Sequence, residues 1–224
     1  MSTHAPSPVP SPPALPSVFV LGTHNEKKRR EMEQLLAPLG IRLLTLSDVP
    51  NPLKVDESGT TFLENAILKA RQQASHLGQW TVGEDSGLCV PYLDGAPGVY
   101  SARYAGPDAT DAANNAKLLE ALERAEGDQR RAFYVSTIAL SDPQGNIVAT
   151  AEGRCWGRIL RQMRGTGGFG YDPLFEIPEY HRTFAELGPT VKGVLSHRGR
   201  AIERFRQALL RLAPIVEGRR KNSQ

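Results

Sequence analysis

Cysteine is scarce in this chain, with only Cys89 and Cys155 among 224 residues. Each stands among apolar or aromatic neighbours, as buried thiols do. The count argues against a disulfide framework and against a zinc site. Long apolar runs are also lacking, since none approaches the roughly 20 residues that cross a bilayer. We therefore expect a cytoplasmic protein without a membrane partner.

An excess of one charge is lacking as well. The chain carries 27 Lys and Arg against 24 Asp and Glu, a net charge of +3, and its basic residues are spread along its length. So mild a balance argues against non-specific nucleic-acid binding, and no nucleic-acid partner is expected. With 40% hydrophobic and 23% charged residues, the composition is that of an ordinary globular protein.

Charge is absent from residues 5–16, a segment that contains six prolines. The segment has neither the cationic start nor the continuous apolar stretch of a signal peptide. Its composition is typical of a disordered, polyproline-II-like tail. Because no composition break divides the middle of the chain, we predict a Pro-rich tail over 1–16, one domain over 17–214 and a polar tail over 215–224.

The first structured elements follow that tail. The apolar run at 17–22 predicts a buried strand, and 41–46 predicts a second one. Between them, Asn25 is a suitable N-cap for a helix and Gly40 a suitable end for it. This strand–loop–helix–strand unit predicts an α/β fold, a sheet with helices packed on it.

Later segments continue the pattern. A capping box at 61–64 predicts a helix to about residue 76, and 110–125 predicts a third helix. The turn signal at 142–145 predicts a hairpin between the β-rich runs 131–141 and 146–153. A last helix begins near Ser196 and presents an apolar face of Ile202, Phe205, Leu209 and Leu212.

The loop between the first strand and helix is a candidate phosphate site. Free backbone N–H groups at a helix N-terminus, with the helix dipole behind them, favour an anion. The loop lacks the GxxxxGK[ST] pattern, so a P-loop NTPase is not indicated. The alternative is an ordinary capped helix with solvated lysines. The candidate residues are Thr23, His24, Asn25, Glu26, Lys27 and Lys28.

Two adjacent carboxylates, Glu84 and Asp85, precede a Ser86-Gly87 pair that predicts a turn. Neighbouring carboxylates repel, and burying their charge is costly unless a cation compensates it. Mg²⁺ does so with oxygen ligands and usually keeps waters for a phosphate substrate. The intervening helix can return Glu57 to the same end of the sheet, so we predict a metal site of Glu57, Glu84 and Asp85. A solvated acidic turn is the alternative.

A glycine-rich segment at 165–170 matches GxGxxG by letter only, because Pro173 denies the helix that a dinucleotide fingerprint must open. A glycine-rich loop holding aromatic rings suits a flat, stackable ligand such as a nucleobase. The alternative is an irregular turn with core aromatics. The candidate ligand-binding residues are Phe169, Gly170, Tyr171 and Asp172.

A basic cluster of Lys192, His197 and Arg198 lies at the start of the last predicted helix. Like charge is unfavourable at a helix N-terminus, and a broken local rule is a hint of function. We predict that donors from His197 and Arg198 read the base of the ligand. A surface basic cluster is the alternative.

Six segments, taken in order, resemble the motifs of the inosine/xanthosine triphosphate pyrophosphatase family. They read TxNxxK, ExGxTFxENAxxKA, D/E-D-S-G, GAPGxYSARYAG, GTGGFGYDPxF and KxxxSHRGxA, at 23–28, 57–70, 84–87, 95–106, 165–175 and 192–201. The resemblance covers about residues 17–213, and six ordered motifs make a chance match implausible. Two departures stand out: His24 occupies a position that is more often small, Asn or Gly, and Glu84 replaces an aspartate.

The resemblance implies an elongated mixed sheet flanked by helices in two lobes, a nucleotide cleft between the lobes, and a homodimer. It also implies Mg²⁺-dependent hydrolysis of non-standard purine nucleoside triphosphates (ITP, dITP, XTP) to the monophosphate and pyrophosphate, which clears them from the nucleotide pool. In that reaction Asp85 orients or deprotonates the attacking water, and Ser86 contacts the substrate. The alternatives are a house-cleaning pyrophosphatase with another base preference and a nucleic-acid-binding module.

Overall fold

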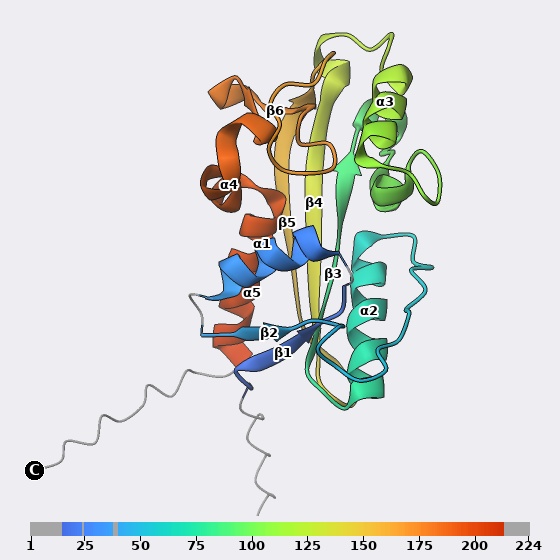
Figure 1. Cartoon of the computed structure of the whole chain (residues 1–224). Coiled ribbons are helices and arrows are strands. Elements are labelled where there is room, and N and C mark those ends of the chain that lie inside the picture. The colour runs from blue at the N-terminus through green and yellow to red at the C-terminus, as the bar shows by residue number, and fades with distance from the viewer. Residues whose placement is uncertain (1–14, 24, 38–39, 213–224) are drawn as a thin grey trace, which may run out of the picture.

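The computed structural model describes residues 15–23, 25–37 and 40–212. They form one mixed sheet of seven strands, in the order β2-β1-β3-β4-β5-β6-β7 (Figure 1). Strand β1 runs parallel to β2 and β3, and the other pairs are antiparallel. The predicted α/β fold with a mixed sheet is confirmed. The strands are β1 (Val18–Leu21), β2 (Arg42–Leu44), β3 (Thr81–Cys89), β4 (Arg131–Ser141), β5 (Ile147–Ile159), β6 (Phe175–Ile177) and β7 (Arg182–Thr183).

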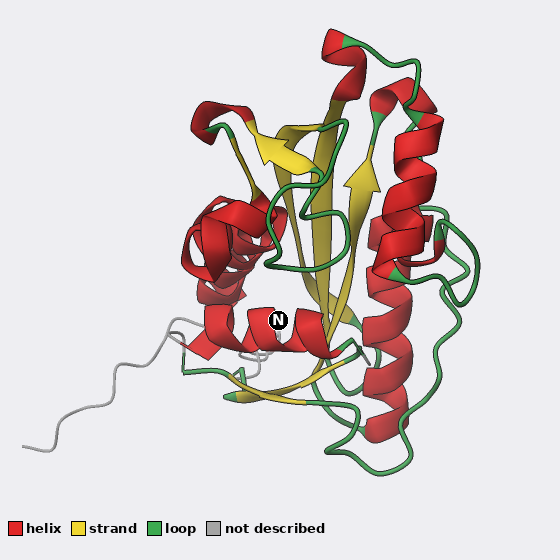
Figure 2. Cartoon of the chain, turned by 45° about the horizontal axis from the view of Figure 1, so that its top comes forward, coloured by secondary structure: helices red, strands yellow, loops and turns green. Residues whose placement is uncertain are grey.

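Helices cover both faces of the long strands. Helix α2 packs on β3 and β4, while α5 packs on β4 and β5 from the opposite side (Figure 2). The α-helices are α1 (Glu26–Leu36), α2 (Phe62–Leu77), α3 (Asp111–Ala121), α4 (Phe184–Leu195) and α5 (His197–Leu212). Short 3₁₀ turns complete the set: η2 (Pro91–Leu93), η3 (Gly98–Arg103), η4 (Gly127–Arg130) and η5 (Pro178–Tyr180).

Local side-chain chemistry explains where several elements begin. The Asn25 side chain accepts hydrogen bonds from the N–H groups of Lys27 and Lys28, both at 3.1 Å, and so caps α1 as predicted. Thr61 and Glu64 form the predicted capping box of α2. Helix α5 begins at His197, next to the predicted start. The Asp142 carboxylate accepts from the N–H groups of the following residues and fixes the predicted hairpin.

The predicted turn at Ser86-Gly87 is wrong, because β3 runs unbroken from Thr81 to Cys89. Its glycines provide room for neighbouring backbone instead. A Cβ at Gly83 would lie 2.1 Å from the Ala66 carbonyl oxygen of α2, and a Cβ at Gly87 would lie 2.4 Å from the Ser101 hydroxyl of η3. Close approach therefore explains these glycines, as it does in many strand interiors.

Helix α4 was not predicted from the sequence. It contains Gly188 with φ 76° and ψ 169°, followed by Pro189, so its periodicity is interrupted by a kink. Strand β5 is also longer than predicted and extends to Ile159. Both differences lie in the half of the chain that builds the upper part of the sheet in Figure 1.

Two large apolar clusters form the core. One joins β1, β3 and β4 to α1 and α5, and the other joins β3, β4 and β5 to α3 and to segment 171–184. Both cysteines are buried as predicted, and burial raises the pKa of each thiol to about 11.

Leu15 packs against the first cluster, two residues before the predicted domain start. Of the predicted Pro-rich tail over 1–16, only residues 15 and 16 are among the described residues. The predicted polar tail over 215–224 lies outside them entirely. No helix in the described ranges combines the length and apolarity needed to span a membrane.

The place where β1 ends creates the candidate site. Strand β1 pairs with β3 only at Thr81 and Val82, and the chain then leaves the sheet after Leu21. Within the described part of the chain, the β1-facing edge of β3 therefore has no strand partner from Gly83 to Leu88, before an isolated bridge joins Cys89 to Pro97. Open edges of this kind, where neighbouring strands diverge, are where α/β sheets bind ligands.

Candidate functional site

Glu84 and Asp85 lie on the open edge of β3 and are both buried, at 1% and 5% exposure. Successive side chains of a strand point to opposite faces, and their partners agree with this. Glu84 contacts groups on the α1 and α5 side, whereas Asp85 contacts α2. The two carboxylates therefore lie on opposite faces of the sheet and have different partners.

Glu84 is enclosed by cations. Its carboxylate accepts a hydrogen bond from the Ser136 hydroxyl at 2.8 Å and from Arg198 Nη2 at 3.2 Å, and Lys28 Nζ lies 3.0 Å from Oε2. Burial alone would raise the pKa of Glu84, but the charges of Lys28 and Arg198 hold it far below its usual value. Glu84 is thus ionised at neutral pH and fixes two cations beside the open edge.

Asp85 shares one lysine with Glu57. Lys69 Nζ lies 3.0 Å from Asp85 Oδ1 and 3.1 Å from Glu57 Oε2, and the Asn65 amide donates to Asp85 Oδ2 at 3.3 Å. Burial raises the pKa of Asp85 above its ordinary value, although the charges of Lys69 and Lys28 oppose the rise. A raised pKa makes this carboxylate a better proton acceptor than an ordinary aspartate.

The predicted three-carboxylate metal site is not formed. No group of three or more His, Cys, Asp or Glu side chains converges in the described residues, because Glu84 lies on the other face of β3. Glu57 and Asp85 do line one hollow, with Lys69 between them. Two carboxylates that leave room for water and phosphate oxygens fit the way proteins usually bind Mg²⁺. The residues present thus fit a Mg²⁺ site of Glu57 and Asp85 without Glu84.

The predicted phosphate loop is partly committed to internal contacts. Lys28 pairs with Glu84, and Lys27 Nζ lies 3.0 Å from Asp111 Oδ2. Glu26 is exposed and pairs with Arg29, away from the other candidates. Thr23 and Asn25 face the hollows described below. His24 lies outside the described residues.

The glycine-rich loop is held by Asp172. The carboxylate accepts from the Phe169 N–H at 2.8 Å and pairs with Lys192 Nζ at 2.7 Å. Gly170 is bound from both sides, since its N–H donates to Asp111 at 3.0 Å and its carbonyl accepts from Asn115. Tyr171 is a core residue, 3% exposed, whose hydroxyl donates to the Ser101 carbonyl. Phe169 is therefore the ring best placed to stack on a ligand.

The basic cluster is buried, so it is not a solvated surface patch. Arg198 is 1% exposed and donates to Glu31, Glu84 and Ser86. Arg198 also lines the aromatic hollow, so base reading by Arg198 stays a prediction. His197 stacks on Tyr134 with ring centroids 4.6 Å apart, and burial followed by the charge of Arg198 lowers its pKa well below the usual value. The neutral imidazole lines the aromatic hollow, while its Nδ1 is buried and has no hydrogen-bond partner among the described residues.

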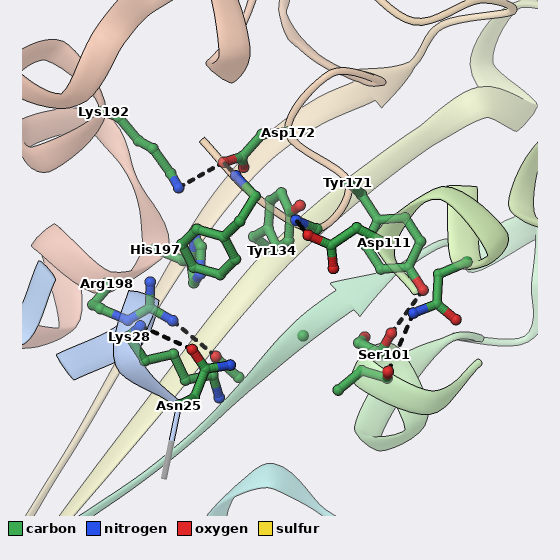
Figure 3. Close-up of a pocket in the computed structure, with 16 residues that line it drawn as sticks. Asn25, Lys28, Ser101, Asp111, Tyr134, Tyr171, Asp172, Lys192, His197 and Arg198 are labelled. Atoms are coloured by element: carbon green, nitrogen blue, oxygen red, sulfur yellow. Dashed lines mark hydrogen bonds and ion pairs between the residues drawn. The ribbon is translucent and has the colours of Figure 1, made fainter. Parts of the chain in front are cut away.

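These residues line two adjoining hollows. The aromatic hollow, about 100 Å³, is lined by Phe169, Tyr134 and His197 and also by Lys192 and Asp172 (Figure 3). The cationic hollow, about 320 Å³, is lined by both carboxylates of the Lys69 bridge and by four cations: Lys28, Lys54, Lys69 and Arg103. Asn25, Lys28, Ser86 and Ala102 line both hollows and mark their junction.

Three site residues were missed by the sequence reasoning. Lys69 holds Asp85, Glu31 holds Lys192 and Arg198, and Asp111 holds Lys27 and Gly170. A signal existed for Lys69, because polar residues recur every fourth position on the face of α2 that also carries Ala66 and Ala70. Those polar residues, all buried, are Asn65, Lys69 and Gln73.

Comparison with known proteins shows the family and the fold of this chain. The model of the Ham1 family matches residues 19–208. A dITP/XTP pyrophosphatase of Rhodopirellula baltica is 52% identical over 194 residues, covering 87% of this chain and 93% of the relative. One of Desulforamulus reducens is 49% identical and covers 87% and 96%. The solved structure of a HAM1 protein from Coxiella burnetii, 42% identical, superposes with a TM-score of 0.77 over 87% of this chain and 98% of that one.

Proposed function

The chain belongs to the Ham1 family, and we propose on that premise that it hydrolyses non-standard purine nucleoside triphosphates. The substrates are ITP, dITP and XTP, and the products are the nucleoside monophosphate and pyrophosphate. The observation that carries the proposal is the buried Asp85 in the cationic hollow, next in the chain to Ser86, which lines the junction with the aromatic hollow. This arrangement fits a base on one side of the reacting bond and phosphates on the other.

Asp85 is the proposed general base. Its raised pKa favours accepting a proton from the attacking water, and Lys69 holds the carboxylate in position at 3.0 Å. Lys28 and Ser86 at the junction are placed to meet the phosphate next to the ribose. Thr23 and Asn25 line the same stretch.

Mg²⁺ is the proposed cofactor, held by Asp85 and Glu57. When bound, the ion would neutralise phosphate charge and polarise the phosphoanhydride. Glu84, which the sequence placed among the ligands, instead orients Lys28 and Arg198. Lys69 already lies between the two proposed ligands, so it compensates their charge in the protein without metal.

Base recognition is proposed for the aromatic hollow. Phe169 is the stacking ring, and three cationic groups lie within 6 Å of its centre: Lys27, Lys192 and Arg198. His197 presents the neutral imidazole to the same hollow, where it can exchange a hydrogen bond with an oxopurine. Lys192 and Asp172 form the far wall.

A nucleotide panel tests the function. We expect pyrophosphate release from ITP, dITP and XTP with Mg²⁺. Release should be at least about 10²-fold slower from ATP, whose 6-amino group leaves the site's donors unpaired, and from GTP, whose 2-amino group the other purines lack. Chelating the metal should remove the activity. A preference for modified pyrimidine triphosphates would support the alternative base preference. Salt-sensitive binding to nucleic acid without turnover would overturn the assignment as an enzyme.

We also propose that the chain acts as a homodimer in the cytoplasm, with a domain over 17–214. An apolar groove of about 590 Å³ is lined by Leu63, Tyr100, Phe133 and Val135 between α2 and β4. Trp156 lies beside it, 47% exposed, with its ring centre 4.6 Å from that of Phe133. Leu63, Tyr100 and Trp156 are exposed here, and such a group of exposed apolar side chains is typical of a surface between copies.

The oligomeric state is measured by sedimentation. Wild-type protein should sediment as a dimer, and Trp156→Arg should shift it toward the monomer because a charge would be buried at the interface. The control is Val194→Arg, since Val194 is 74% exposed on α4, away from the groove. A wild-type monomer would contradict the dimer without touching the proposed reaction.

A further inference from the structure

Arg103 is a basic residue of the cationic hollow that none of the roles above uses. It ends the 3₁₀ helix η3, within the segment Gly95–Gly106, and η3 packs on β3. Arg103 is half-buried and lines the same hollow as Asp85 and Lys69. Arg103 lines the cationic hollow but not the aromatic one, and it follows Ala102, which lines the junction.

The charge balance of the hollow singles out Arg103. Lys28 pairs with Glu84, and Lys69 pairs with Glu57 and Asp85. Within the ranges that the structure describes, Arg103 forms no ion pair, and its guanidinium lies against the ring of Tyr100 at 5.3 Å. Lys54 also lacks an ion pair there, but its side chain is exposed. Arg103 is thus a half-buried positive charge without an anionic partner in the described part of the chain.

The backbone around Arg103 is fixed from two sides. The Ser101 hydroxyl accepts from the Leu88 N–H at 2.9 Å, which ties η3 to β3. Asn114 of α3 accepts from the Ala105 N–H at 2.8 Å and donates to the Ala102 carbonyl at 3.1 Å, so it brackets Arg103. With the backbone fixed and the guanidinium against the Tyr100 ring, Arg103 needs less reorganisation than a free arginine when negative charge develops beside it.

We infer that Arg103 binds the pyrophosphate half of the substrate and stabilises it as the leaving group. The inference rests on the proposed function. The water oxygen bonds to the α-phosphorus, Asp85 takes the water proton, and the bond from that phosphorus to the bridging oxygen breaks. The electron pair of the broken bond stays on the β-phosphate. A guanidinium offers two parallel donors to the oxygens of a phosphate, which a lysine does not.

Arg103→Gln tests the inference, with Arg103→Lys beside it. We expect Arg103→Gln to lower kcat for ITP about 10²-fold, the loss usual when one fixed donor to developing charge is removed. It should also weaken inhibition by pyrophosphate at least about tenfold while leaving inhibition by IMP within about twofold. Arg103→Lys should recover part of both losses, because it keeps the charge but not the paired donors.

The matched control is Arg124→Gln, an exposed arginine outside both hollows. It should leave all three quantities unchanged. Equal weakening of pyrophosphate and IMP inhibition, unchanged kcat in Arg103→Gln, or a wild type that pyrophosphate does not inhibit would each overturn the role of Arg103. A wild type that releases no pyrophosphate from any nucleotide would instead overturn the proposed function itself.

Discussion

Asp85→Asn is expected to slow pyrophosphate release from ITP by about 10² or more while the protein stays folded. The amide has nearly the same shape as the carboxylate but neither accepts a proton nor holds a cation. One hydrogen bond is also lost, because Lys69 and Asn65 are both donors to the two Asp85 oxygens. That loss costs about 1 kcal/mol. Turnover is measured at saturating ITP, and folding by circular dichroism.

Asp108→Asn is the control, since Asp108 is exposed and outside both hollows. It should turn over like the wild type. If a folded Asp85→Asn protein did the same, Asp85 would not be the base.

The pH profile gives a second measurement on the same residue. A carboxyl that must be ionised to accept a proton loses activity as the pH falls through its pKa. Burial raises the pKa of Asp85 in the metal-free protein, so its carboxyl should titrate above the range of an ordinary aspartate without Mg²⁺, and a bound Mg²⁺ would move the acid limb of kcat down from there. The sign for folding is opposite: because the folded pKa is raised, Asp85 contributes less stability as the pH rises through that pKa.

Arg198→Ala is expected to destabilise the fold by about 3–5 kcal/mol, because it leaves Glu84 and Glu31 as carboxylates without their shared buried cation. Chemical denaturation at neutral pH measures the loss. Kinetics should show ITP turnover falling as well, since Ser86 also loses its bond from Arg198.

The matched control for this variant is Arg206→Ala on the same helix. Arg206 donates two hydrogen bonds to Glu203, but both side chains are exposed, so the cost should stay below about 1 kcal/mol. If Arg198→Ala were as stable as wild type and narrowed the ratio of ITP to ATP turnover, the direct base reading expected from the sequence would hold instead.

Local chemistry was predictable from the sequence, and convergence in space was not. Asn25, the Thr61 capping box and the turn after Asp142 act within a few residues, so their patterns gave the correct elements. Ser86-Gly87 has the composition of a turn, but the glycine makes room for η3, which no local pattern reveals. Helix α4 was also not predicted, because the kink at Gly188 interrupts the helical pattern of its sequence.

In the candidate site, too, the local motifs could be predicted from the sequence and the long-range contacts could not. Thr23, Lys28, Asp85, Ser86, Phe169, Lys192 and His197 all line the two hollows, as their motifs indicated. The structure does not bring Glu84 together with Glu57 and Asp85, because neighbouring side chains of a strand point to opposite faces. Lys69, Glu31 and Asp111 act through partners 12 or more residues away, a relationship that a single sequence does not display.

Glu84 and Asp85 point to opposite faces of β3, so the strand should not tolerate the insertion or deletion of a residue before them. One residue inserted between Val82 and Glu84 would keep both acids in the protein but exchange their faces. Asp85 would then meet Arg198, and Glu84 would meet Lys69, with side chains of the wrong length for either. We expect an alignment gap to be far rarer here than a substitution, since the spacing as well as the residues sets which acid meets which cation.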